Sequence, residues 1–125
     1  MKCKVMLIVA CFILTVSAAL AASPRLNTSV EAKQLIDKGA VFLLDVRTPE
    51  EYRQGHLRGA VLIPVDQVEK RVGEIPRKRP VLVYCAVGSR SGAAAAFLSG
   101  KGYPDVITMS DGIVGWFRNG FPVER

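Results

Sequence analysis

Cysteine and histidine are scarce in this sequence of 125 residues, which has three cysteines and a single histidine, His56. Two of the cysteines, Cys3 and Cys11, lie in an apolar N-terminal segment, so the rest of the chain keeps only Cys85. A structural zinc site needs about four Cys or His ligands at fixed spacings. The sequence therefore predicts no metal site, and we expect no cofactor.

Dense runs of Lys and Arg interleaved with aromatic residues are also missing. Aromatic residues make up 7% of the sequence, and the formal net charge is +6. A nucleic-acid-binding domain usually carries a basic patch or stripe on one face, so we expect no nucleic-acid partner. The basic run "PRKRP" at residues 76–80 is interpreted as a solvated surface loop.

Residues 1–21 have the pattern of a cleaved secretory signal peptide. Lys2 and Lys4 precede an unbroken apolar run at residues 5–13, and residues 19–21 have the A-x-A form of a cleavage site. The run is short for a membrane span, which needs about 20 apolar residues. Two alternatives stay open: an uncleaved N-terminal anchor, and a lipoprotein signal at Cys11, although the apolar run continues past that cysteine.

Cleavage after Ala21 leaves residues 22–125 as one domain. Loss of Lys2 and Lys4 lowers the formal charge from +6 to +4, a modest excess that favours small anions. Cys85 is then the only cysteine, and it cannot form an internal disulfide. We expect a periplasmic or secreted domain without stable membrane association, with a monomer as the default state.

Short apolar runs alternate with helical patterns along this domain, which predicts an α/β fold with a mostly parallel sheet and helices on both faces. The expected strands are residues 41–45, 60–65, 81–84 and 105–109. The expected helices begin at Thr28, at Thr48, at Asp66, at Ser89 or Ser91, and at Asp111, and residues 23–27 are expected to be an irregular lead-in.

Cys85 directly follows one of the predicted strands and begins a Gly/Ser-rich turn that leads into a helix. Ligands of such sheets bind outside the carboxyl ends of the strands. Free N–H groups at a helix N-terminus attract anions and lower the pKa of a thiol. We therefore interpret Cys85 as a reactive thiolate beside an anion site. The alternative is a buried structural cysteine, which this turn disfavours.

Three stretches resemble the signatures of the rhodanese family of sulfurtransferases. They are "LLDVRTPEEYRQGHLRGAVLIPV" (residues 43–65), "YCAVGSRS" (residues 84–91), which contains a Cys-x-x-Gly-x-Arg loop, and "DGIVGWFRNGFPV" (residues 111–123). The resemblance implies a three-layer sandwich around a central sheet of about five strands. One departure is Asp111, which stands before Gly112 where the family often has a second glycine.

By this resemblance, the Cys85 thiolate takes the outer sulfur of a small anionic donor such as thiosulfate and becomes a persulfide. Cyanide or a thiol then accepts the sulfur. The resemblance implies that the loop holds the anionic sulfur with Ala86, Val87, Gly88, Ser89 and Arg90. No general base is needed, so we interpret His56 as structural.

Three charged residues near the loop have roles that the resemblance leaves less defined. Arg90 either contributes charge to the anion site or pairs with a carboxylate and braces the loop. Asp45 and Arg47, at the end of the first predicted strand, are expected to brace the rim of the pocket. Ala86 and Val87 are apolar, which predicts a weakly selective site.

Two other functions are compatible with the same loop. Related folds with a Cys-x5-Arg loop are phosphatases or arsenate reductases, but Cys85 and Arg90 enclose only four residues, which is tight for phosphate. A sulfur carrier or a non-catalytic binding module is the second alternative. Retention of Cys85 favours sulfur chemistry over a pure scaffold.

The signal-peptide interpretation predicts that the protein recovered from its native compartment begins at Ala22. Intact-mass spectrometry measures this directly, because loss of residues 1–21 changes the mass far more than any modification of one side chain. A protein that keeps its full N-terminal segment in that compartment would instead support the anchor alternative.

Overall fold

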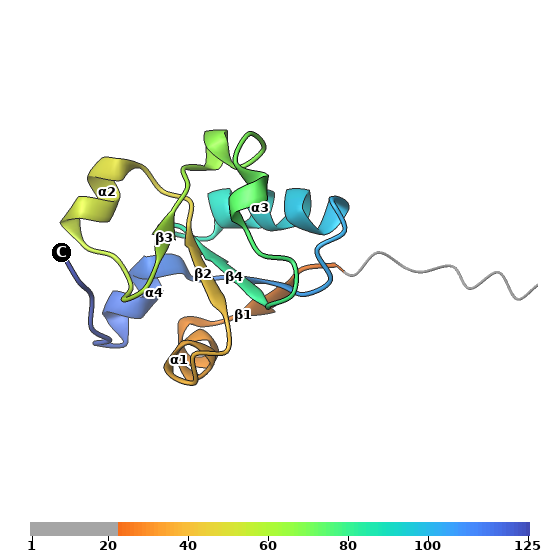
Figure 1. The fold of residues 1–125 in the computed structure, drawn as a ribbon. Coiled ribbons are helices and arrows are strands. Elements are labelled where there is room, and N and C mark those ends of the chain that lie inside the picture. Colours follow the sequence, from red (N-terminus) through yellow and green to blue (C-terminus); the bar gives the residue numbers. More distant parts are fainter. Residues whose placement is uncertain (1–22) are drawn as a thin grey trace, which may run out of the picture.

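Five parallel strands form one sheet in this computed structural model, which describes residues 23–125. The predicted signal peptide lies outside the described residues. The strand order is β1-β5-β4-β2-β3 (Figure 1). The strands are β1 (Arg25–Asn27), β2 (Phe42–Asp45), β3 (Val61–Leu62), β4 (Val81–Tyr84) and β5 (Val106–Met109).

Helices cover both faces of this sheet and give the three layers that the sequence predicts. Helix α3 (Ser89–Gly100) packs on one face, and α1 (Ser29–Asp37) and α4 (Gly112–Arg118) pack on the other (Figure 1). The short helix α2 (Pro49–Gln54) connects β2 to β3. Within residues 23–125, no helix combines the length and apolar character needed to cross a membrane.

Strand β4 is buried on both faces, as its continuous apolar run predicts. Val81 and Val83 belong to the cluster packed under α3, whereas Leu82 and Tyr84 belong to the cluster under α1 and α4. All four residues are fully buried. Because side chains alternate along a strand, the next residue, Cys85, lies on the α3 face.

The predicted helix starts at Thr28 and Thr48 are confirmed. Each threonine accepts a hydrogen bond from the amide three residues later, and the glutamate at that position bonds back to the threonine amide. These reciprocal bonds satisfy two N–H groups that have no partner within the helix. The cap at Thr48 fixes the start of α2, and it also orients Glu51.

Two predictions about local structure are wrong. The helix expected at residues 66–75 is instead two 3₁₀ turns, η1 (Val65–Gln67) and η2 (Val72–Glu74), neither of which has a side-chain cap. Gly73 disfavours an α-helix here, although Val65, Val68, Val72 and Ile75 still pack against the α3-side core. The expected lead-in contains β1, which pairs with β5. That partner is about 80 residues away, so no local pattern indicates the pairing.

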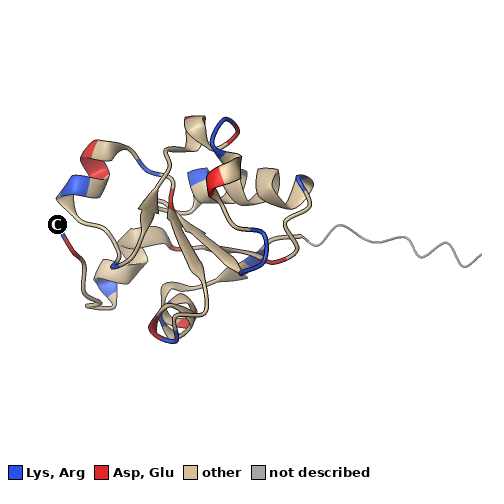
Figure 2. Ribbon diagram, viewed as in Figure 1, with Lys and Arg blue, Asp and Glu red and all other residues tan. Residues whose placement is uncertain are grey.

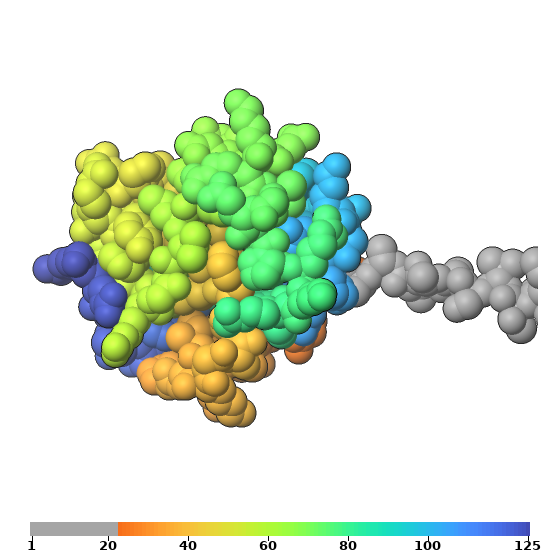
Figure 3. Space-filling model, in the orientation of Figure 1, coloured from red at the N-terminus to blue at the C-terminus, as the bar shows by residue number. Residues whose placement is uncertain are grey.

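One basic loop and the C-terminal segment lie on the surface of the described residues. The basic run at residues 77–79 forms an exposed loop before β4 (Figure 2). The C-terminal segment lies against the residues that follow α2, where His56 and Glu124 form an isolated antiparallel bridge (Figure 3). This bridge holds the C-terminal end of the chain close to α2.

Helix α4 begins in direct contact with the Cys85 loop (residues 85–90). The amides of Ile113 and Val114 donate to the carbonyl oxygens of Cys85 and Ala86 at 2.9 and 3.1 Å. Gly112 makes this approach possible: its φ is +61°, and an added Cβ would lie 2.1 Å from the Ala86 oxygen. Only glycine fits at this position.

Gly112→Ala is expected to lower the free energy of unfolding by ~3 kcal/mol or more, because backbone strain and overlap with Ala86 add together. Gly39→Ala is the matched control: its φ is +65°, but no atom lies within 4 Å of the added Cβ. That variant should lose only ~1 kcal/mol from strain. Denaturant unfolding measures both, and equal losses would argue against the close approach.

Candidate active site

The Cys85 loop runs from the carboxyl end of β4 into the N-terminus of α3. The sequence suggests Ser89 or Ser91 as the helix cap, but the N-cap is Gly88, in the left-handed conformation with φ +100° and no side-chain cap bond. The sulfur of Cys85 takes the role of the missing cap. It accepts hydrogen bonds from the amides of Gly88 and Ser91 at 3.1 and 3.3 Å.

These contacts explain the acidity of the thiol. Burial by itself raises the pKa of Cys85, but the Ser91 hydroxyl and the amides of Ser91, Gly88 and Val87 more than offset it. The net result is a pKa below the ordinary value of 9.0. Hydrogen bonds to the charged form stabilise it. These hydrogen bonds therefore stabilise the thiolate relative to that of an ordinary cysteine, without a neighbouring base.

Cys85 is fully buried, which the sequence analysis disfavours. The burial follows from the loop geometry, because the turn folds its amides over the sulfur and places Cys85 at the edge of the α3-side core. The sulfur nevertheless has polar neighbours on the loop side. A donor can reach it only when the covering atoms move.

The loop residues predicted as the anion site surround the sulfur in different ways. Gly88 donates its amide to the sulfur, and the Val87 amide also lowers the pKa of Cys85. The side chains of Val87 and Ser89 are exposed, whereas those of Ala86 and Arg90 are half-buried. Gly88 lies so close to the residue after β5 that an added Cβ would be 2.6 Å from the Ser110 oxygen.

Ser91 is a site residue that the sequence analysis missed. It is fully buried, its amide donates to the Cys85 sulfur, and its Oγ lies 3.5 Å from that sulfur. It occupies the third helical position after Gly88, and the amide there ordinarily bonds to an N-cap side chain. Counting three residues from a glycine N-cap would have identified it.

Arg90 pairs with a carboxylate, which is one of the two roles that the sequence leaves open. Its two terminal nitrogens donate to the two carboxylate oxygens of Glu51 at 2.7 and 2.9 Å. This hydrogen-bonded pairing lowers the pKa of Glu51 to about 2. The sequence analysis noted Glu51 only as part of a helix start. The pair connects α2 to the Cys85 loop.

Asp45 and Arg47 form a buried ion pair at the carboxyl end of β2. The guanidinium Nη2 donates to Asp45 Oδ2 at 2.8 Å and to the Gly55 oxygen at 2.7 Å. A buried pair of this kind needs such extra bonds to offset the loss of hydration. It holds the far end of α2 on the sheet, so Arg47 contributes to the position of Glu51.

His56 contacts the C-terminal segment and α2. Its Nδ1 lies 2.9 Å from the Tyr52 oxygen, and its ring stacks on the Tyr52 ring with centroids 3.7 Å apart. Its backbone forms the bridge with Glu124. These contacts support a structural role.

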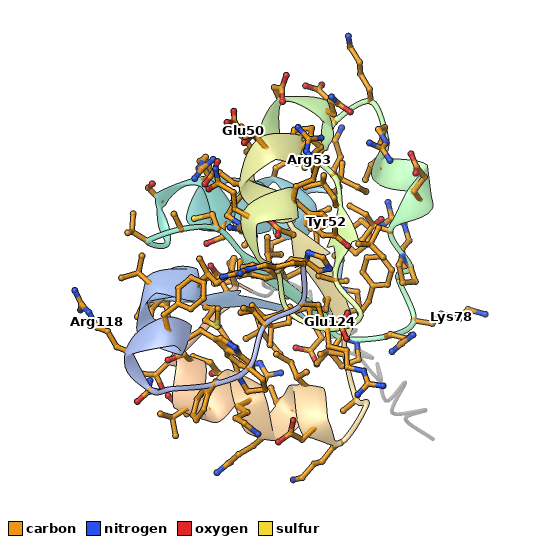
Figure 4. All side chains as sticks on the ribbon, turned by 90° about the vertical axis from the view of Figure 1, so that its left-hand side faces the viewer. Glu50, Tyr52, Arg53, Lys78, Arg118 and Glu124 are labelled. Atoms are coloured by element: carbon orange, nitrogen blue, oxygen red, sulfur yellow. The ribbon has the colours of Figure 1, made fainter. Side chains whose placement is uncertain are left out.

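A polar hollow of about 240 Å³ lies between α2 and α4, lined by Arg47, Glu51, Gln54, Gly55 and Phe117. Glu51 connects this hollow to the Cys85 loop through Arg90. Figure 4 shows Glu50 and Arg118 extending outward from α2 and α4, away from the body of the protein. The described residues contain no group of three or more His, Cys, Asp and Glu side chains that could hold a metal ion.

Known proteins are similar to this chain in sequence and in fold. A sulfurtransferase of Allochromatium vinosum is 39% identical over 92 residues, which cover 74% of this chain and 86% of that protein. A crystal structure of a rhodanese-related protein from Thermoplasma volcanium matches with a TM-score of 0.73 and 32% identity, over 80% of this chain and 97% of the other.

A thiosulfate sulfurtransferase from Pseudomonas aeruginosa matches with a TM-score of 0.73 and 26% identity, over 82% of this chain but only 20% of that larger protein. The model of the rhodanese-like domain family matches residues 28–119, which include the Cys85 loop and most of the described fold. On this evidence, the chain belongs to the rhodanese-like domain family.

Proposed function

We propose that the protein is a sulfurtransferase that carries sulfur as a persulfide on Cys85. The observation that carries the proposal is the pair of amides, from Gly88 and Ser91, that bond the Cys85 sulfur at 3.1 and 3.3 Å. They stabilise a thiolate and provide a cradle for an anionic sulfur atom. The names of the Allochromatium and Pseudomonas relatives support sulfur transfer as the reaction class.

The reaction has two half-reactions. In the first, the Cys85 thiolate attacks the outer sulfur of thiosulfate, a sulfur–sulfur bond forms, and sulfite leaves with the electron pair of the broken bond. In the second, cyanide or a thiolate attacks the outer sulfur of the persulfide, and Cys85 leaves as a thiolate. Covalent catalysis of this kind gives ping-pong kinetics.

The charge distribution supports a weakly selective donor site. Arg90 is already paired with Glu51, and Arg47 is paired with Asp45. Backbone amides and the N-terminus of α3 therefore meet most of the negative charge of a donor. The hollow between α2 and α4 is connected to the loop by the bond from Arg90 to Glu51. This arrangement fits a small sulfur anion without strict requirements on its shape.

A sulfur carrier that loads Cys85 and releases the sulfur only to a specific partner protein is the second candidate. The same geometry supports it, because loading needs the same thiolate. The phosphatase alternative has less support, because the amides that should bind three phosphate oxygens are folded onto the sulfur itself.

Incubation with thiosulfate is expected to increase the intact mass of the protein by one sulfur atom, and cyanide should remove it. Cys85→Ser should abolish the gain because it removes the nucleophile. The full-length form of the variant still contains Cys3 and Cys11, so any remaining gain in that form would place the acceptor elsewhere and contradict the proposal. Loading without release to cyanide or small thiols would favour the carrier.

The role of Arg90 is tested by a pair of variants. If Arg90 braces the loop through Glu51, Arg90→Gln and Glu51→Gln should each slow sulfur loading by about fivefold, the equivalent of ~1 kcal/mol. Glutamine at position 51 keeps the capping box. Steady-state kinetics with thiosulfate measure both effects.

Glu50→Gln is the control, because Glu50 is exposed and has no ion-pair partner among the described residues. It should leave the rate unchanged. Direct binding of the donor by Arg90 predicts a different result: Arg90→Gln raises KM for thiosulfate, whereas Glu51→Gln frees the guanidinium and lowers it. That opposite response would overturn the bracing role.

A further inference from the structure

A buried threonine on β5 is bonded to the hydroxyl that faces the reactive sulfur. Thr108 is 3% exposed, and its Oγ1 donates to the Oγ of Ser91 at 3.0 Å. Ser91 is fully buried, and its Oγ lies 3.2 Å from the Gly88 oxygen and 3.5 Å from the Cys85 sulfur. Hydrogen bonds thus connect Thr108 on β5, Ser91 on α3 and Cys85 in the loop after β4.

The single hydroxyl proton of Ser91 limits which hydrogen bonds this network can form. A hydroxyl has one proton to donate and can accept two hydrogen bonds. Beside a neutral thiol, Ser91 accepts from the sulfur and donates to the Gly88 oxygen. Beside a thiolate, which has no proton, the Ser91 hydroxyl is free to turn its own proton toward the sulfur.

This rotation of the Ser91 hydroxyl leaves no buried acceptor without a hydrogen-bond partner. The Gly88 oxygen still accepts from the Gly92 amide at 3.0 Å after the Ser91 proton has moved. Thr108 continues to donate to Ser91, which directs the Ser91 proton away from β5. A hydroxyl that accepts one hydrogen bond also becomes a stronger donor in the next.

We propose that Thr108 is a positioning residue for sulfur transfer, acting through the Ser91 hydroxyl to stabilise the Cys85 thiolate. The inference rests on the proposed function, in which that thiolate is both the attacking group and the leaving group. In the second half-reaction the sulfur–sulfur bond breaks, and Cys85 keeps the electron pair. The Ser91 proton then turns from Gly88 to the sulfur.

Charged side chains around the loop are already committed to other partners. Asp45 bonds to Arg47 on the sheet, and Glu51 bonds to Arg90 at the start of α3. Asp111, before α4, accepts from the amide and hydroxyl of Ser29. Neutral donors therefore supply the direct contacts to the sulfur, and among them only the Ser91 hydroxyl depends on a further side chain.

Thr108→Val tests the role with almost no change in side-chain volume. The pKa of Cys85 is measured from the ultraviolet absorbance of the thiolate against pH. The absorbance of Cys85→Ser is subtracted to remove the contributions of the tyrosines and of any other cysteine. Loss of the Thr108 donor should raise the thiol pKa by about half a unit, and Ser91→Ala by about one unit. Release of sulfur from the preformed persulfide to a small thiol should slow in the same order.

Two controls separate hydroxyl chemistry from packing. Thr108→Ser keeps the hydroxyl but loses a buried methyl group, so it should lower stability while the thiol pKa stays near that of the parent protein. Ser99 lies on the same helix as Ser91, and its buried Oγ has no hydrogen-bond partner among the described residues. Ser99→Ala should therefore change neither the pKa nor the release rate.

An unchanged thiol pKa in Thr108→Val would overturn the inference, as would a pKa that rises equally in Thr108→Ser. The titration requires no sulfur donor, so it stands apart from the proposed function. A parent protein that never gains sulfur would contradict sulfur transfer, while the pKa values of the variants would still decide the role of Thr108.

Discussion

The first amides of α3 need a hydrogen-bond acceptor, and the sulfur of Cys85 is that acceptor. The rest of the site depends on this contact. It requires a left-handed glycine at position 88, close approach to β5, and a glycine at position 112 so that α4 can pack on the loop. At the start of α3, the Cys85 sulfur takes the place of the Ser, Thr, Asp or Asn side chain that usually caps a helix. The same bonds close the helix end and stabilise the thiolate.

Helix α2 is the second support of the loop, although none of its residues touches the sulfur in this structure. Buried Arg47 fixes the end of α2 by its bonds to Asp45 and Gly55, and the cap at Thr48 fixes its start. Glu51 is therefore held where it can pair with Arg90. The Glu51–Arg90 pair is only partly buried, so the buried Asp45–Arg47 pair and the cap at Thr48 contribute most to the rigidity of α2.

Most of the fold could be predicted from local patterns, because β4, α1 and α2 carry apolar runs or capping boxes within a few residues. The loop around Cys85 was also identifiable, by its position between a strand and a helix. Contacts between distant segments could not be predicted. The pairing of β1 with β5, the bond from Thr108 to Ser91 and the partner of Arg90 all join residues whose proximity only the folded chain creates.

Because all five strands are parallel, their amino ends lie on one side of the sheet and their carboxyl ends on the opposite side. The chain enters β1 at Arg25, on the side where the strands begin, whereas Cys85 follows β4 on the side where the strands end. In Figure 1 β1 begins on the side of the described residues that lies away from α2 and α4. A fusion partner or affinity label joined just before Arg25 would consequently lie at the opposite end of the strands from the Cys85 loop.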